Sequence, residues 1–382
     1  MKQVAHLMRK MLPPTASFIY NQIVHYRTFV PHVIYCEAVD SVFANRLTEA
    51  YPMYSPLRSA ADRLRYRVAR QLSPAARRRL VRYLRTARID LLHVHYGVDA
   101  LVYADVFREL NIPVLVSFYG YDCTSFPNRF GGWGLRWLQR SLFANRYVSA
   151  YTAMSPDMEA DLRRLGCPAE KIIVHYHGSD PEPFWYERTY ADREEVHLLI
   201  VSSLTAKKGH LFLLEAFQQA QRQTSQKMYL HIVGDGELQE TLMQRIREQS
   251  IEQVYLHGPV DYGSEQHHAF LEKADIFVHP SVTTPQGEKE GIPGALIEAR
   301  SNGLPVIATR HAGIPFIIEH EKTGWLVPEY DTEALAQALV RLAENASLRA
   351  ALGKAGQVYT RGYLDVRKKE KDLEQIYRQI LE

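Results

Sequence analysis

The feature that most constrains the fold of this chain is a regular alternation of short apolar segments with longer amphipathic patterns. The apolar segments are rich in β-branched residues and run without polar alternation, which is typical of parallel strands covered on both faces. The pattern predicts an α/β protein with two doubly wound, Rossmann-like domains. The expected strands are residues 3–8, 32–36, 90–96, 113–119, 147–153 and 171–177 in the first half, and 196–204, 228–234, 253–258, 274–280, 305–309 and 324–328 in the second.

The break between the halves falls in residues 178–195, which are rich in proline, acids and aromatic residues and have no periodic pattern. We predict an N-terminal domain over 1–183, a C-terminal domain over 184–364 and a terminal helix over 365–382 that packs back on the N-terminal domain. Ligands of such sheets bind beyond the carboxyl ends of the strands. We therefore expect the two domains to face each other across a cleft that holds the site.

Local composition indicates the cellular setting. No apolar run approaches the ~20 residues that span a bilayer, and the polar start of the chain is too short for a secretory signal. Cys36, Cys123 and Cys167 are scattered and form no CxxC pair. This favours reduced thiols in a cytoplasmic protein over disulfides or metal ligands.

Residues 57–88 are rich in arginine, with Asp62 as the single acid. They contribute to a basic first half, in which residues 1–185 hold 24 Lys and Arg against 15 Asp and Glu. The region is interpreted either as a solvated helical face or as a surface that meets anionic lipid or a phosphate-bearing acceptor at the inner face of the cell membrane. A nucleic-acid partner is disfavoured because no recognised binding motif accompanies the arginines.

The stretch EGIPGALIEARSNGLPVIA, residues 290–308, predicts a phosphate site at the start of a helix. Pro293 suits a first helical turn, where its missing N–H is not needed. Gly291 and Gly294 leave the backbone open to close approach by a ligand. The free N–H groups and the positive dipole end of such a helix attract phosphate.

Two carboxylates flank this site. Glu298 lies within the apolar part of the helix, where a buried carboxylate needs hydrogen-bond donors that ribose hydroxyls would supply. Glu290 precedes the helix, where it would accept hydroxyls of a sugar. The alternative is a capped helix in which Glu298 bonds to protein groups. Further turns after strands of the same half support a ligand site at this edge, and they contain Lys207 and Lys208, Gly234 and Gly236, and Gly313 to Pro315.

Together these motifs resemble the retaining glycosyltransferases of the GT-B fold, family 4, and among them the bacterial exopolysaccharide enzymes of the colanic-acid and amylovoran type. The resemblance covers essentially the whole chain. The segments that carry it, in order, are PPTASFIYNQI (13–23), LLHVHYG (91–97), SFYGYD (117–122), residues 154–184, GDGEL (234–238), LHGPV (256–260), HPS (279–281) and GEKEGIPGALIEARSNGLPVIAT (287–309).

The resemblance implies a role for each donor-side residue. Glu298 would hold the ribose of a nucleotide sugar, Lys208 would neutralise its diphosphate, and Glu290 would contact hydroxyls of the transferred hexose. The segment 258–260, with Pro259 and Val260, would lie near the base. The phosphates and the sugar would be bound by the backbone around Gly291, Ile292, Pro293 and Gly294, and near Gly234, Gly313 and Ile314.

Three positions depart from the family pattern. The usual Arg five residues before the phosphate lysine is Ser203, so a bidentate cation is missing and Lys207 would substitute for it. The usual His of the FHGYD segment is Tyr119, and the acid often found after GIP is Phe316. His95 would partly compensate for Tyr119, although a core or turn histidine is the alternative.

The acceptor is expected on the first domain. It would lie near Thr15, Ser17, His95 and Tyr119. Trp133 and Trp137 are interpreted either as core or interface residues or as a platform for sugar.

The predicted reaction is transfer of a hexose from a nucleotide diphosphate sugar to a glycan acceptor, expected to be lipid-linked, with retained anomeric configuration. UDP-glucose or another UDP-hexose is the first choice of donor and GDP-mannose the next. Catalysis would rest on Glu290, Lys208, His95 and Tyr119. No metal is expected, because no DxD pair is present, and no cofactor is expected besides the donor substrate.

Three rival functions share the architecture. A non-catalytic nucleotide-sugar-binding protein would bind donor without turnover. A sugar-nucleotide epimerase would isomerise donor without an acceptor, and a phosphorylase would need inorganic phosphate. A dinucleotide dehydrogenase is disfavoured because no GxGxxG follows the first strand.

Overall fold

The computed structural model describes residues 1–13, 16–25 and 28–382. It divides the chain into two compact units, Met1–Gly178 with Val366–Glu382, and Ser179–Asp365. The division falls at Gly178, whereas the sequence suggested a boundary after residue 183, within the turn η4 (Glu182–Phe184) of the second unit.

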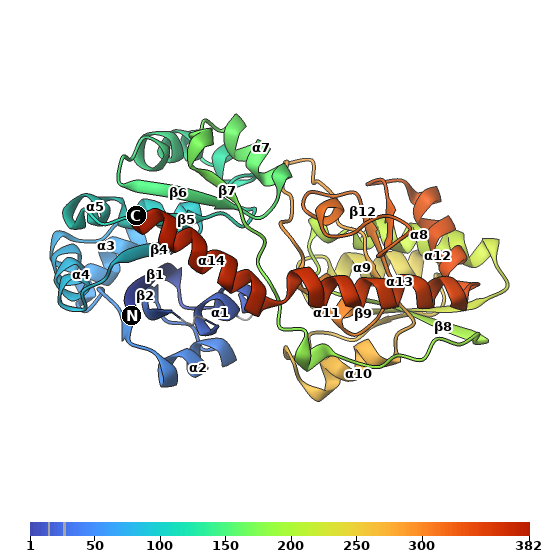
Figure 1. The fold of residues 1–382 in the computed structure, drawn as a ribbon. Helices are drawn as coiled ribbons and strands as arrows, with labels where there is room; N and C mark the ends of the chain where they lie inside the picture. Colours follow the sequence, from blue (N-terminus) through green and yellow to red (C-terminus); the bar gives the residue numbers. More distant parts are fainter. Residues whose placement is uncertain (14–15, 26–27) are drawn as a thin grey trace. The chain divides into compact units, whose positions relative to one another are not determined.

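The first unit is built on a sheet of seven strands in the order β3-β2-β1-β4-β5-β6-β7, all paired in parallel among the described residues (Figure 1). Sequence order reverses between the neighbours β1 and β4, so this is the switch point of the sheet. The strand β3 was not predicted because it has only two residues and lies at the sheet edge. The strands are β1 Lys2–Lys10, β2 Phe29–Glu37, β3 Met53–Tyr54, β4 Leu91–His95, β5 Val114–Ser117, β6 Val148–Ala153 and β7 Ile172–Val174.

Helices cover both faces of this sheet, which explains why its strands are continuously apolar. One face buries Ala5, Leu92 and Val116 in the largest core cluster of the unit, together with side chains of α4 and α5. The helices are α1 Ser17–Val24, α2 Val42–Ala50, α3 Ala60–Ala69, α4 Pro74–Thr86, α5 Gly97–Leu110, α6 Trp133–Trp137 and α7 Pro156–Arg164, with a π-helical turn, η2, at Leu138–Phe143.

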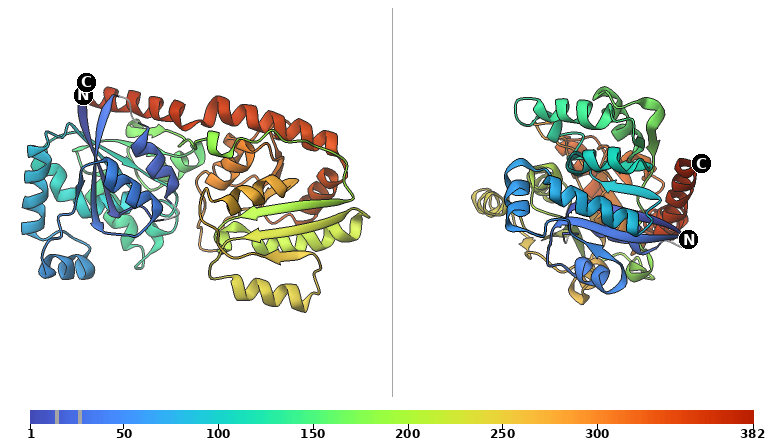
Figure 2. Two further views of the ribbon diagram at one scale, coloured as in Figure 1. Left: turned by 90° about the horizontal axis from the view of Figure 1, so that it is seen from below. Right: turned by 90° about the vertical axis from the view of Figure 1, so that its left-hand side faces the viewer.

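The helix expected over 365–382 is α14, Val366–Leu381, and it packs on the first unit. Its Leu373, Ile376 and Tyr377 form a cluster with strand residues such as Val4 and Leu91 on the face opposite to α5. Figures 1 and 2 show it lying along the first sheet. The two parts of this unit therefore come from opposite ends of the chain.

The second unit has a six-stranded sheet in the order β10-β9-β8-β11-β12-β13, again paired in parallel. All six strands expected in this half are present. They are β8 Glu195–Val201, β9 Lys227–Val233, β10 Val254–Leu256, β11 Ile276–His279, β12 Val306–Thr309 and β13 Trp325–Val327. The helices are α8 His210–Gln223, α9 Gln239–Glu248, α10 Glu265–Lys273, α11 Gly294–Ser301, α12 Thr332–Ala343 and α13 Ala346–Tyr359.

The arginine-rich region 57–88 forms α3 and α4. Its one acid, Asp62, is buried and accepts hydrogen bonds from Ser59, Ser73 and Arg79. Burial opposes ionisation of Asp62, but the bonds from Ser73 and Ser59 outweigh it and lower its pKa to about 2. Asp62 therefore ties the start of α3 to α4 as a fixed anion.

The three cysteines are buried thiols that form no disulfide within the described chain. Burial raises the pKa of both the Cys36 and the Cys167 thiol to about 12, so these groups stay protonated at neutral pH. In the part of the chain that the structure describes, every helix is too short or too polar to cross a bilayer.

Candidate functional site

Lys208 and Glu290 form an ion pair at the carboxyl edge of the second sheet. Lys208 ends the turn η5 (Ala206–Lys208) after β8, and Glu290 lies in the loop after β11. β8 and β11 are neighbours in the sheet although they are far apart in the sequence, so the pair stands at the switch point. Parallel α/β sheets bind their ligands at such points.

The Glu290 carboxylate is held on both oxygens. Oε1 contacts Lys208, whereas Oε2 accepts hydrogen bonds from His279 Nε2 at 3.1 Å and Ser281 Oγ at 3.0 Å. Burial opposes its ionisation, but the Lys208 charge and the His279 hydrogen bond hold the pKa of Glu290 well below its usual value. Glu290 is thus a fixed anion beside a cation.

His311 fixes the loop that carries Glu290. Its Nε2 accepts the backbone N–H of Glu290 at 3.0 Å, and its Nδ1–H donates to Glu329 Oε1 at 2.7 Å. Glu329 Oε2 in turn accepts the backbone N–H of Thr283 at 2.6 Å. The following residue, Ala312, has a φ of 44°, an uncommon conformation for a residue with a side chain. These bonds hold the loops after β11 and β12 in one arrangement.

The helix α11 begins at Gly294, so Pro293 is its N-cap and not, as predicted, a residue of its first turn. Within the described residues no side chain caps this end. Its first N–H groups and its positive dipole end therefore have no side-chain partner there, which suits an anion.

Glu298 lies one turn inside α11, and its carboxyl points back toward the start of the helix. Its Oε1 would be 3.5 Å from a Cβ placed on Gly294. Burial raises the pKa of Glu298 to about 8, against a hydrogen bond from Tyr262 that favours the ionised form. His267 Nε2 lies 3.9 Å from Oε2. Glu298 is thus bonded to a protein group, as the capped-helix alternative expected, and its carboxyl also lies near the predicted phosphate position.

Two glycines of the site are required by close backbone contacts. A Cβ on Gly209 would lie 1.9 Å from Pro280 O, and a Cβ on Gly234 would lie 1.9 Å from Ser202 O. Both also have positive φ, at 70° and 136°. The structure thus gives Gly234 a packing role between the turns after β8 and β9.

The remaining donor-side predictions lie around the same edge. Lys207 pairs with Glu288 at 3.2 Å, and Ser203 is exposed in the turn after β8. Gly258 accepts a hydrogen bond from the Gly234 N–H at 2.8 Å, which brings the segment with Pro259 and Val260 beside that turn. The other predicted residues form the loop before α11, namely Gly291 and Ile292, and the start of the turn η6 (Ile314–Phe316), namely Gly313 and Ile314.

In the first unit, the predicted His95 and Tyr119 contact each other. His95 Nδ1 is 2.8 Å from Tyr119 Oη, and the Tyr119 hydroxyl is 3.4 Å from Gln22 Oε1. His95 Nε2 is 2.8 Å from His6 Nδ1. Burial lowers the pKa of His95 to about 3, so it is neutral.

His6, His93 and His95 place nitrogen atoms within the reach of a single metal ion. However, both ring nitrogens of His93 and of His95 already have protein partners, since His93 contacts Tyr377 Oη at 2.6 Å and Ser117 Oγ at 2.7 Å. The cluster, hereafter the histidine network, is therefore a set of neutral side chains joined by hydrogen bonds in this structure.

Asp122 is a further polar residue of this edge that the sequence interpretation did not single out. It is fully buried and accepts the backbone N–H groups of Gly97 at 2.8 Å and of Tyr119 and Gly120 at 3.1 Å. Burial raises its pKa to about 6 against these bonds. The adjoining Tyr96 has a φ of 74°, so strained backbone also marks this edge.

The predicted acceptor-side residues are only partly described. Thr15 lies outside the described residues, and Ser17 is the half-buried first residue of α1. Trp133 and Trp137 lie on α6 and are partly exposed, so neither is a core residue. Phe316, in place of the family's acid, is also exposed.

Two doubly wound units, each built on a parallel sheet with polar loops at its switch point, are typical of the GT-B class of protein. In agreement, the structure matches that of Anabaena HepE in complex with UDP, with a TM-score of 0.77 at 20% identity over 99% of this chain and 100% of that one. A sucrose-phosphate synthase from Thermosynechococcus elongatus matches with a TM-score of 0.75 at 19% identity over 100% and 99% of the two chains. At this identity the likeness shows the fold alone.

The family follows from sequence. Residues 26–183 match the model of Glycosyltransferase Family 4, and residues 195–345 match that of Glycosyl transferases group 1. The chain therefore belongs to the group 1, family 4 glycosyltransferases, as the resemblance indicated.

Two relatives within this family are glycosyltransferases of exopolysaccharide biosynthesis. The chain is 39% identical to the putative colanic acid biosynthesis glycosyltransferase WcaL of Escherichia coli K12 over 270 residues, which is 67% of this chain and 62% of the relative. It is 41% identical to the amylovoran biosynthesis glycosyltransferase AmsK of Erwinia amylovora over 181 residues, 47% of this chain and 44% of the relative. The matched regions thus span less than two thirds of these relatives.

Proposed function

We propose that this protein is a retaining hexosyltransferase of exopolysaccharide or cell-envelope polysaccharide synthesis. It would move a hexose from a nucleotide diphosphate sugar, with a UDP-hexose as first choice and GDP-mannose next, to a lipid-linked glycan. The single observation that carries the proposal is the pair of Lys208 with the buried Glu290 beside the uncapped end of α11. Family membership and the names of WcaL and AmsK support the pathway.

The leaving group of this reaction is the nucleoside diphosphate, whose negative charge grows as the bond to the anomeric carbon breaks. Lys208 and the N–H groups at the start of α11 would stabilise that charge without reorganising, the role that a metal ion has in metal-dependent transferases. Glu290 would accept hexose hydroxyls on the face opposite to the phosphate. Glu298 would accept ribose hydroxyls, which favour its ionised form.

Retention is proposed to follow from attack on the same face of the sugar. The acceptor hydroxyl would form the new bond to the anomeric carbon while the bond to the phosphate oxygen breaks. The hydroxyl proton would pass to the departing phosphate. His95 and Tyr119 would position the acceptor through the histidine network. The protein would be cytoplasmic, at the inner face of the membrane.

The test is a panel of UDP- and GDP-sugars scored for thermal stabilisation and slow hydrolysis. Wild type is compared with Lys208→Ala and Glu290→Gln. Lys227→Ala is the matched control, because Lys227 forms an exposed pair with Glu195 in the same unit. We expect one donor class to stabilise wild type and Lys227→Ala, with binding weakened roughly tenfold or more in the other two variants.

Each rival predicts a different result in the same assay. Donor binding with no turnover, even when lipid-linked acceptor is supplied, would identify a non-catalytic binding protein. Isomerised donor in the absence of acceptor would identify an epimerase. Unchanged binding in Lys208→Ala and Glu290→Gln would refute the assignment of these residues.

A further inference from the structure

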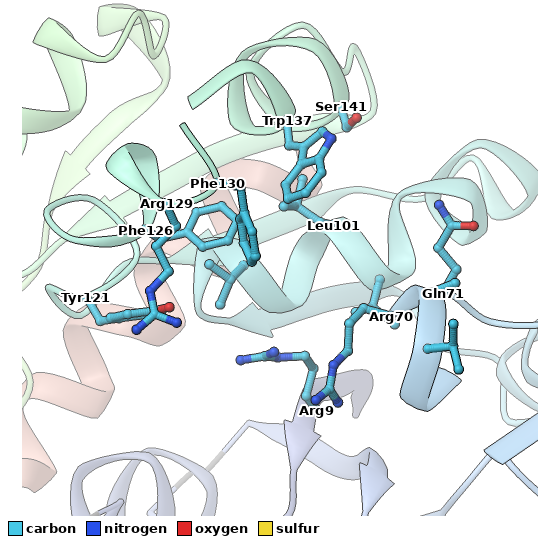
Figure 3. Close-up of a pocket in the computed structure, with 14 residues that line it drawn as sticks. Arg9, Arg70, Gln71, Leu101, Tyr121, Phe126, Arg129, Phe130, Trp137 and Ser141 are labelled. Atoms are coloured by element: carbon cyan, nitrogen blue, oxygen red, sulfur yellow. The ribbon is translucent and has the colours of Figure 1, made fainter. Parts of the chain in front are cut away.

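The first unit contains a pocket that the donor site in the second unit does not explain (Figure 3). It encloses about 560 Å³, within the usual size range of small-molecule sites. Its walls come from the end of β1, the end of α3, one face of α5 and the segment 121–141. All of these belong to one unit, so the pocket is complete within it.

The pocket lies at the switch point of the first sheet. Arg9 is near the carboxyl end of β1, whereas Val98 and Leu101 belong to α5, which directly follows β4. Because β1 and β4 are the neighbours between which the strand order reverses, this is the edge position where doubly wound sheets bind ligands.

One side of the pocket is cationic. Arg9, Arg70 and Arg129 line it, and no Asp or Glu among the described residues does so. Arg9 pairs through Nε with the buried Asp99, which leaves its two terminal nitrogens without an acceptor in the described chain. Arg70 pairs with Glu37 at 2.9 Å, but both are exposed, so this pair is weak.

Arg129 is the most available of the three cations. Its guanidinium lies 5.5 Å from the centre of the Tyr121 ring. Across the described ranges its side chain has no hydrogen-bond acceptor and no carboxylate partner. Figure 3 shows the guanidinium groups of Arg9 and Arg129 below the rings of Phe130 and Trp137, with Tyr121 beside Arg129. An anion placed between them would gain charge-assisted hydrogen bonds.

The pocket also has apolar side chains that are open to water. Phe130 is 63% exposed, Val68 78% and Trp137 42%, and the rings of Phe130 and Trp137 are 5.5 Å apart. Exposed apolar side chains that gather in a pocket mark a binding surface, because covering them releases ordered water. A hydrocarbon chain would cover them.

We propose that this pocket binds a long-chain phosphate or diphosphate, with its anionic head between Arg9 and Arg129 and its hydrocarbon chain against Phe130 and Trp137. An anionic head fits better than a neutral sugar, since the described lining holds three guanidinium groups, Arg9, Arg70 and Arg129, and no carboxylate. The inference rests on the proposed function in one respect: the long-chain phosphate or diphosphate would be the lipid that carries the acceptor glycan.

The experiment measures binding of farnesyl diphosphate to the full chain by calorimetry and by tryptophan fluorescence. Excess UDP is present so that the donor site is filled. Farnesol, inorganic diphosphate and phosphatidylglycerol vesicles are run in parallel. We expect saturable binding of farnesyl diphosphate that both farnesol and inorganic diphosphate fail to match.

The variants are Arg129→Gln and Phe130→Ser, whose side chains are peripheral to the core. Arg136→Gln is the matched control, because Arg136 stacks on the Trp133 ring and does not line the pocket. Arg129→Gln should weaken farnesyl diphosphate binding roughly tenfold or more, and Phe130→Ser should weaken it several-fold. Arg136→Gln should bind like wild type.

Several outcomes would overturn the proposal. Equal affinity for inorganic diphosphate would reduce the pocket to a simple anion site, and equal affinity for farnesol would remove the role of the arginines. Binding of vesicles without binding of farnesyl diphosphate would assign the surface to the membrane. If Lys208→Ala loses UDP binding but still binds farnesyl diphosphate, the donor site and the pocket are independent, as the proposal requires. Failure of every nucleotide sugar to bind would refute the proposed function alone.

Discussion

The polar edges of the two sheets differ in how they are charged. At the switch point of the second unit, Lys208, Glu290 and Glu329 carry formal charges in tightly bonded positions. On the first sheet, the network centred on His95 is neutral, because burial depresses the imidazole pKa values. The comparison teaches that the switch point of the second unit is held by fixed charges, whereas the histidine network holds its geometry through neutral hydrogen bonds.

The largest effect is expected from breaking the charged edge. Lys208→Ala leaves the Glu290 carboxylate buried without its cation, which should destabilise the second unit by about 3–5 kcal/mol. Urea unfolding followed by circular dichroism measures this. The double variant Lys208→Ala, Glu290→Gln should regain most of the stability without regaining donor binding. A loss within error for the single variant would show that the pair is not a coupled unit.

Glu298→Gln should stabilise the ligand-free protein in a pH-dependent way. The pKa of Glu298 in the folded state is about 8, above its ordinary value of 4.5. Its contribution is therefore fully present below about pH 4.5 and is lost as the pH rises through 8. The variant should match wild type near pH 4.5 and exceed it by about 1–3 kcal/mol at pH 8.5, measured by urea unfolding. A pH-independent difference would exclude this titration as the cause.

A smaller effect is expected from the neutral histidine network. Tyr119→Phe removes the hydroxyl that contacts His95 and should cost about 1 kcal/mol. UDP-sugar binding, which we propose for the second unit, should be unchanged. Urea unfolding and calorimetry test the two parts. Weakened donor binding in this variant would show that the two edges act together.

The smallest effect is expected from restoring a family residue. Ser203→Arg adds a cation at an exposed position of the donor edge, and should tighten UDP binding roughly three- to tenfold with stability changed by less than about 0.5 kcal/mol. Calorimetry with UDP gives the affinity. No gain would indicate that Lys207 already fills this role.

Much of the fold could be predicted, because continuous β-branched segments that alternate with helices are typical of buried parallel strands and of few other structures. The strand at Met53–Tyr54 could not be, since two residues carry no period. The start of α11 was misplaced by one residue, because Pro293 suits both the N-cap and the first turn. The sequence also gave no sign of how Asp62 joins α3 to α4, which depends on tertiary contacts.

The sequence was enough to predict which residues form the candidate site, but not the ion pairs and hydrogen bonds between them. Strand ends placed Lys208 and Glu290 at one edge, but their pairing depends on strand order, which periodicity does not reveal. His279 ends β11 and His311 follows β12, yet an isolated histidine at a strand end is equally suited to packing. His93 and His95 alternate visibly in one strand, whereas the approach of His6 needed the register between strands.

The chain passes from one unit to the other twice, at Gly178–Ser179 and at Asp365–Val366, and a bridge between Ser179 and Asp365 holds these crossings together. A cut at Gly178–Ser179 would leave the second unit covalently joined to α14 alone, so only the packing of α14 on the first sheet would still hold it to residues 1–178. Truncation before Val366 would remove α14 from the first sheet and expose Val4 and Leu91 to water. We therefore expect soluble expression of the amino-terminal portion to require the terminal helix.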